Sequence, residues 1–350
     1  MILYRLVFAC VLVIGALGVA SCAREAGDET RRVVLYSSVD DYVLREVVRD
    51  FERETGIEVL LVGDTEATKT TGLVTRLLAE KDAPKADVWW SSEPFGTIRL
   101  AKEGVLDAYA SADAEAAFED GWPAWLRGEG GTWYGFALRA RVIAYSTKRV
   151  EDPPNRLRDL TDPRWKGRVG IARPQFGTTR GHMGALTSLW GLDNFESWLE
   201  DLKANGVRLY DGNATVVRKI AEGEIDIGLT DTDDVWAGQR NGWDVELTYE
   251  DTEKIAMYGK GSFGPLIIPN TAAIVRGAPN RDEAEELMNY LLMGPAERAL
   301  RSSDSHNWPV FPGVGDHPDA SRPWTRFPWD LEAIAERVPE AIAICERVLD

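Results

Sequence analysis

Short apolar strands alternate with amphipathic helices along this sequence, and the alternation starts again after the middle of the chain. The first predicted strands cover residues 33–36, 57–62 and 86–90, with helical patterns between them. The second set begins near residue 165 and ends with a strand at 225–229. Strands that alternate with helices build βαβ units, and these units build mostly parallel sheets. The sequence therefore predicts an α/β protein.

Two longer apolar segments, at residues 133–145 and 265–275, divide these elements into two groups. A chain of 350 residues exceeds what one hydrophobic core usually holds, so we expect two lobes. One segment would leave the first lobe and the other would return to it. This predicts two mixed sheets joined by two crossing hinge strands, with a ligand cleft between the lobes. The predicted boundaries are 33–137 plus 264–305 for lobe 1 and 138–263 plus 306–350 for lobe 2.

The N-terminus has the pattern of an export signal. Arg5 precedes an apolar run that ends in Val19-Ala-Ser-Cys22, which is similar to a bacterial lipobox. We predict a lipoprotein signal peptide over 1–21, a lipid on Cys22 and a flexible tether over 22–32. The mature protein would be exported and held at the membrane by its lipid, in the periplasm or on the outer face of the cytoplasmic membrane. An ordinary secretory signal cut near the same place is the alternative.

Charge and cysteine content exclude several kinds of function. The formal net charge is −17, and a surface with this excess of carboxylates repels nucleic acid. With Cys10 in the signal and Cys22 carrying the lipid, only Cys345 remains, so we expect no disulfide framework and no thiolate metal site. We predict a monomeric body that meets small molecules or metal ions.

A cluster of carboxylates follows the predicted strand at 225–229. Asp231, Asp233 and Asp234 lie within four residues of one another. Ligand crevices of α/β sheets lie at the C-terminal ends of strands. Crowded carboxylates repel one another unless a cation, hydrogen-bond donors or solvent relieves the repulsion. The cluster therefore predicts a ligand-binding site, and a solvated turn that caps the next helix is the alternative.

Six short segments carry a family resemblance: Val34-Leu-Tyr-Ser-Ser38, Thr55-Gly-Ile57, Ala86-Asp-Val88, Trp165-Lys-Gly-Arg-Val-Gly170, Gly223-Glu-Ile-Asp226 and Asn280-Arg-Asp-Glu-Ala-Glu285. In this order they resemble the ferric-ion-binding solute-binding proteins of bacterial ABC importers. The resemblance covers about residues 33–312 and implies the type II periplasmic-binding-protein fold. It also implies a protein that is not an enzyme, has no cofactor, and delivers Fe³⁺ or a divalent cation as cargo to an ABC permease.

The resemblance also indicates where a metal would bind. The family holds ferric iron with a histidine, a glutamate and two adjacent tyrosines. In this sequence Asp40 takes the histidine position, Ser92 takes the glutamate position with Glu93 next to it, and Asp233 and Asp234 take the positions of the tyrosines. The metal ligands implied are therefore Asp40, Glu93, Asp233 and Asp234, with aspartates in place of the paired phenolates.

The anion part of the family site has matching positions too. Gly177 and Thr178 fall at a helix start, where backbone N–H groups bind phosphate or carbonate. Asn213 matches an amide donor, and Arg139 and Arg141 match arginines of the crossing strand. The alternatives are that Thr178 only caps its helix and that the arginines pair with carboxylates of the protein.

Other functions fit parts of the pattern. A small zwitterion, such as an aminoalkylphosphonate or an amino acid, would place its ammonium against the aspartates and its anion against the helix start. A cage of Trp90 and Trp236 would bind a quaternary amine. The spacing Asp231-x-Asp233-x-Val235 also fits the start of a haloacid-dehalogenase-like phosphatase. The only later aspartates available for such an enzyme, Asp316 and Asp319, lie in a Pro/Gly-rich loop instead of after a buried strand.

Overall fold

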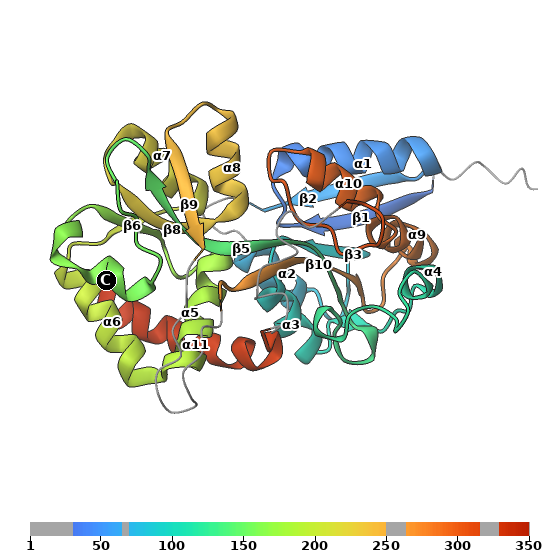
Figure 1. The fold of residues 1–350 in the computed structure, drawn as a ribbon. Helices are drawn as coiled ribbons and strands as arrows, with labels where there is room; N and C mark the ends of the chain where they lie inside the picture. Colours follow the sequence, from blue (N-terminus) through green and yellow to red (C-terminus); the bar gives the residue numbers. More distant parts are fainter. Residues whose placement is uncertain (1–30, 65–69, 250–263, 316–328, 350) are drawn as a thin grey trace, which may run out of the picture. The chain divides into compact units, whose positions relative to one another are not determined.

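The computed structural model describes residues 31–64, 70–249, 264–315 and 329–349 (Figure 1). The predicted signal peptide, Cys22, most of the predicted tether, Asp316 and Asp319 lie outside these ranges. Residues Arg31–Asp350 cluster as one compact unit. In the part of the chain that the structure describes, no helix is long and apolar enough to cross a membrane.

A mixed sheet runs through this unit in the order β2-β1-β3-β10-β5-β8-β6-β7, with β4 on β10 and β9 on β5. The first strand begins at Arg32, a residue that the sequence prediction had assigned to the tether. The strands are β1 (Arg32–Ser37), β2 (Glu58–Gly63), β3 (Val88–Ser91), β4 (Leu106–Asp107), β5 (Tyr134–Ser146), β6 (Val169–Ala172), β7 (Arg208–Tyr210), β8 (Ile227–Asp231), β9 (Val245–Tyr249) and β10 (Ile267–Val275).

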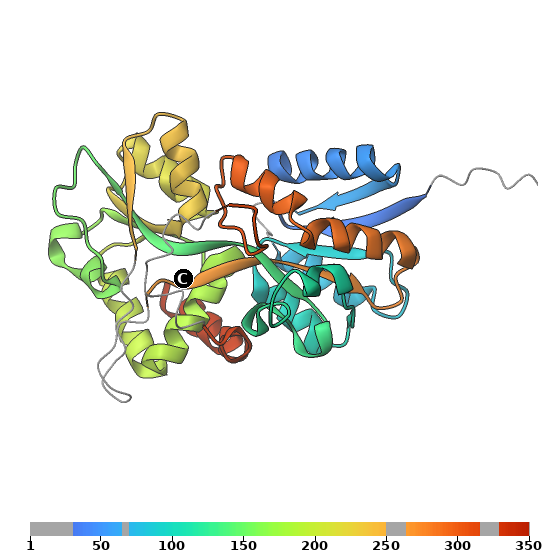
Figure 2. The ribbon, with the colours of Figure 1, turned by 45° about the vertical axis from the view of Figure 1, so that its right-hand side comes forward.

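Strand β5 belongs to both halves of the sheet. Its first part pairs antiparallel with β10, and its second part, from Arg141 onward, pairs with β8 and β9. In the first half β1 pairs parallel with β2 and β3, and in the second half β6 pairs parallel with β7 and β8. The two predicted parallel groups are therefore present, and β5 connects them alongside β10 (Figure 2). The lobe boundaries themselves stay a prediction.

Helices cover the sheet, and their apolar stripes face it. Helix α1 shows the rule: Val43, Leu44, Val47 and Phe51 recur at helical spacing and are all buried. The helices described are α1 (Asp41–Thr55), α2 (Thr71–Ala79), α3 (Pro94–Lys102), α4 (Ala112–Ala116), α5 (Gly177–Trp190), α6 (Leu192–Ala204), α7 (Asn213–Glu222), α8 (Thr232–Arg240), α9 (Arg281–Leu292), α10 (Pro295–Ser302) and α11 (Leu331–Leu349). Helix α11 packs against α5, α6 and α3.

The core follows the alternation of the strands. In β1, Leu35 belongs to one hydrophobic cluster and Tyr36 to another, and in β3 Trp90 and Trp89 divide in the same way. Successive side chains of a strand point to opposite faces, so β1 and β3 each supply both clusters. Because both faces are buried, the polar ends of the strands are left to form a site.

Candidate ligand site

A cavity of about 560 Å³ lies among strand ends and helix starts. This is within the usual size range of small-molecule sites. The structure brings most of the residues predicted from the sequence to its lining: Asp40, Arg139, Gly177, Thr178, Asn213, Asp231, Asp233 and Asp234. Ser92, at the position of the family glutamate, lines it as well. Glu93 and Arg141 are absent from the lining.

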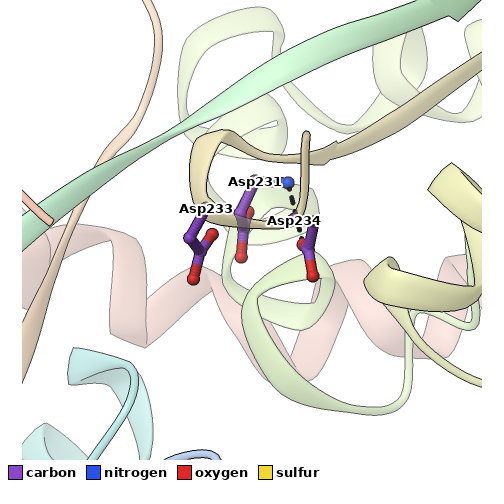
Figure 3. Close-up of side chains that lie close together, drawn as sticks. All are labelled: Asp231, Asp233 and Asp234. Carbon is purple, nitrogen blue, oxygen red and sulfur yellow. Dashed lines mark hydrogen bonds between the residues drawn. The ribbon is translucent and has the colours of Figure 1, made fainter. Parts of the chain in front are cut away.

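The three clustered aspartates lie where β8 ends and α8 begins (Figure 3). Asp231 and Asp234 form a capping box, in which the carboxylate of Asp234 accepts a hydrogen bond of 3.4 Å from the backbone nitrogen of Asp231. The hydroxyl of Thr230 donates to the same carboxylate at 2.9 Å. One oxygen from each aspartate lies within 4.8 Å of the other two. The aspartates that cap α8 thus belong to the same carboxylate cluster, and the binding of a ligand there stays a prediction.

Asp231 is held by positive and polar groups of the protein. Its side chain is almost wholly buried and accepts hydrogen bonds from Arg141 at 2.7 Å, Arg139 at 3.3 Å and the hydroxyl of Thr178 at 2.7 Å. Burial raises the pKa of Asp231, but the two guanidinium groups and the hydroxyl outweigh it, so the pKa lies below its ordinary value. Asp231 therefore stays ionised and stabilises the wall of the cavity.

The two arginines of β5 have different positions. Arg139 lines the cavity and lies 3.4 Å from Asp233, the more exposed of its two carboxylate partners. Burial lowers the pKa of Arg139, but Asp233 and Asp231 more than offset this and raise it overall. Arg141 is fully buried and also donates to Thr178 and Asn213, at 3.2 and 3.3 Å. Both arginines therefore pair with carboxylates of the protein, which was the alternative left open by the sequence. Arg141 acts by positioning Asp231, Thr178 and Asn213.

The starts of four helices meet at the cavity: α1 at Asp40 and Asp41, α5 at Gly177, α7 at Asn213 and α8 at Asp233. Unpaired N–H groups give a helix start a partial positive charge and suit it to anions. The hydroxyl of Thr178 donates to Asp231 and does not cap α5, so the alternative that Thr178 only caps its helix is wrong. From the sequence, only the start of α5 was assigned a role in binding an anion.

The structure does not bring Glu93 into the cavity, which corrects its expected role as a metal ligand. Glu93 is buried and its carboxylate accepts hydrogen bonds from the backbone nitrogens of Phe95 at 2.6 Å and Gly96 at 2.9 Å. It is the N-cap of α3, and Pro94 occupies the first helical position. An acidic residue before a proline is a helix-start signal that could have indicated this. Burial raises the pKa of Glu93, although the two backbone bonds oppose the shift.

Replacing Glu93 with alanine should lower the free energy of unfolding by about 1–2 kcal/mol, because the N–H groups of Phe95 and Gly96 lose their acceptor. Glu93→Gln is the matched control, since it keeps an acceptor oxygen and removes a buried charge, and we expect it to be less destabilising. Urea unfolding of both variants measures the difference. Equal destabilisation by the two substitutions would contradict the capping role.

The aromatic cage expected from Trp90 and Trp236 does not form. Trp90 lies in the core beside Phe136, with ring centroids 5.9 Å apart. Trp236 packs against Trp308 at 5.9 Å. Neither tryptophan belongs to the cavity lining. Both were placed near the site by their position in the sequence, but their rings pack against other aromatic side chains.

Two buried amides that the sequence did not indicate also line the cavity. The side-chain nitrogens of Asn270 and Asn307 both donate to the carbonyl of Ala137, at 2.7 and 3.3 Å. Ala137 has a φ of 45°, which an L-residue rarely adopts. Asn270 lies in β10, Asn307 follows α10, and Ala137 lies in β5. Only the tertiary fold therefore brings these three residues together.

A family model described as "Bacterial extracellular solute-binding protein" matches residues 83–330, which is more than half of the chain. The chain belongs to this family. Membership confirms the predicted solute-binding protein family and is consistent with the expectation that the protein is not an enzyme.

Similar proteins cover nearly the whole of this solute-binding protein. "Iron uptake protein A1" of Synechocystis sp. is 26% identical over 314 residues, which is 87% of this chain and 84% of the relative. The "Putative 2-aminoethylphosphonate-binding periplasmic protein" of Salmonella paratyphi A is 24% identical over 249 residues, 71% of this chain and 68% of the relative. Iron-bound HitA from Pseudomonas aeruginosa superposes with a TM-score of 0.76 at 25% identity, covering 91% of this chain and 99% of HitA. The type II periplasmic-binding-protein fold is thereby confirmed.

Proposed function

We propose that this solute-binding protein captures iron(III), together with a bridging anion, in the 560 Å³ cavity and delivers it to an ABC permease. The observation that carries the proposal is the charge of the lining. Two arginines, Arg139 and Arg173, face six aspartates: Asp40, Asp41, Asp211, Asp231, Asp233 and Asp234. This excess of carboxylate favours a cationic cargo, and hard cations prefer oxygen ligands.

Asp233, Asp234 and Asp40 are the best candidates for contact with the metal, because Asp231 is occupied by two arginines. No tyrosine belongs to the lining formed by the described residues, so carboxylates would replace the paired phenolates. The starts of α5 and α7, with Arg139, would hold the anion. The names of the Synechocystis relative and of HitA support iron as the cargo.

A small zwitterionic phosphonate is the second candidate. The relative from Salmonella paratyphi A is named for 2-aminoethylphosphonate, and a ligand of this kind would use the same helix starts and aspartates. Its phosphonate would meet the helix starts and Arg139, and its ammonium would meet Asp233. Binding of a phosphonate requires no metal ion, so an experiment with and without metal distinguishes this candidate from iron.

A thermal-shift titration of the chelator-treated protein tests the proposal. A ligand that binds only the native state raises the unfolding midpoint by mass action. We expect a rise with ferric citrate that exceeds any change with citrate alone, and none with 2-aminoethylphosphonate. A rise with 2-aminoethylphosphonate and none with ferric or divalent ions would overturn the iron proposal in favour of the phosphonate.

The location follows from the family and the sequence together. Extracellular solute-binding proteins work outside the cytoplasm, and the sequence adds a lipobox at Cys22. We propose that a lipid on this cysteine holds a monomeric body at the membrane beside its permease. Mass spectrometry of the membrane-bound protein would show the lipid on the cysteine, and an unmodified N-terminal peptide would exclude it.

A further inference from the structure

A second cavity of about 270 Å³ lies between α2 and α3 on one side and α5 and α11 on the other. Its apolar wall includes Val74, Phe95, Ile98 and Val338. Three basic side chains also line it: Arg99, Lys102 and Arg180. Nothing in the proposed iron site uses these groups.

Arg99 and Arg180 are the two arginines that line this second cavity. Neither side chain has a hydrogen bond or an ion pair in the described ranges, whereas Arg139, Arg141 and Arg149 are each paired with an aspartate. Arg180 is half-buried and Arg99 is exposed at the opening. Burial lowers the pKa of Arg180; the charge of Glu93 opposes this shift, and the charge of nearby Arg99 adds to it. Two like charges therefore share one cavity without a bonded counterion.

The carboxylates of this cavity form no hydrogen bond or ion pair with either arginine among the described residues, although the charge of Glu93 acts on Arg180 through space. Glu93 directs its oxygens to the backbone nitrogens at the start of α3. Glu336 forms an ion pair of 3.1 Å with Lys102. Glu103 is exposed and, within the described residues, makes no ion pair with either arginine. Each carboxylate therefore has another partner or faces solvent.

We propose that this cavity is a second binding site, for a small oxyanion of the phosphate class held between Arg99 and Arg180. A guanidinium group presents N–H donors in a fixed fork that matches the oxygens of a phosphate or carboxylate. An anion between the two arginines would replace their repulsion with two attractions. The site would join α3 to α5, and Gly177 at the start of α5 lines both cavities.

Inorganic phosphate, titrated into the purified, chelator-treated protein by isothermal calorimetry at constant ionic strength, tests this site. We expect Arg99→Gln and Arg180→Gln each to weaken phosphate binding about tenfold or more, because each removes charge-assisted hydrogen bonds. Arg180→Lys keeps the charge without the fork, so an intermediate loss is expected. Arg99 is exposed and unpaired, so its substitution should leave the thermal midpoint without phosphate unchanged or slightly higher.

Arg173→Gln is the matched control, since Arg173 lines the 560 Å³ cavity and not the second one. Phosphate binding that persists in Arg173→Gln and is lost in the other two variants supports the second site. Binding that is lost in Arg173→Gln and kept in Arg99→Gln and Arg180→Gln would place the anion in the cargo cavity and overturn the proposal. So would a wild-type protein that binds no phosphate. None of these outcomes depends on whether iron is the cargo.

Discussion

Asp231→Asn is expected to lower the free energy of unfolding by about 3–5 kcal/mol, since it removes one partner of a buried ion pair. The substitution preserves the shape of the side chain, removes its charge and replaces one of its two acceptor oxygens with an NH2 donor. Arg139 would keep Asp233 at 3.4 Å, but Arg141 is fully buried and has no other carboxylate partner in the described chain. An uncompensated buried guanidinium is what makes the loss large. Urea unfolding and the thermal midpoint measure it.

Asp244→Asn is the control for this change, because Asp244 pairs with Lys148 at the surface, where such pairs contribute about 0–1 kcal/mol. The pH dependence gives a second check. The pKa of Asp231 is lowered in the folded state, so its stabilisation is present above the unfolded value of about 3.9 and is lost as the pH falls through the folded value. The asparagine variant should lack this part of the acid destabilisation. A loss below 1 kcal/mol would show that the network is not stabilising.

Asp233→Asn is expected to weaken cargo binding about 10–100-fold while changing stability less than Asp231→Asn. Asp233 lines the cavity, and its side chain is 17% exposed, against 4% for Asp231. Losing one charged ligand atom costs about 1.5–3 kcal/mol, which corresponds to this range of affinity. Competition between the protein and a chelator of known affinity measures the change for iron(III).

Asp41→Asn separates direct contact from general electrostatics. Asp41 also lines the cavity, but its carboxylate pairs with Arg45 at the exposed surface of α1. We expect less than a threefold change for this variant. If both variants weaken binding equally, the aspartates act only through their summed field, and Asp233 is not a ligand.

Much of the fold could be read from periodicity. The strands at 33–36, 57–62 and 86–90 and the helix beginning at Asp41 follow from alternation and helical spacing, which each segment expresses without help from the rest of the chain. The acidic cluster was also visible, because Asp231 sits at the end of a buried strand. Glu93 was assigned by its place beside a family position, and its local signal, Pro94 directly after it, indicated a cap instead.

The different roles of the aspartates could not be predicted from periodicity. Asp231 and Asp233 are two residues apart and both line the cavity, yet Asp231 is buried against Arg141 and Asp233 is the more exposed of the two. The partners of Asp231 come from residues 90 and 53 positions away, so their approach depends on how β5, α5 and β8 pack. The sequence by itself determined the α/β pattern, the acidic charge and the cluster of aspartates at the end of β8. The tertiary structure alone decided which carboxylates stabilise the wall and which remain for a ligand, because burial and ion pairing depend on long-range contacts.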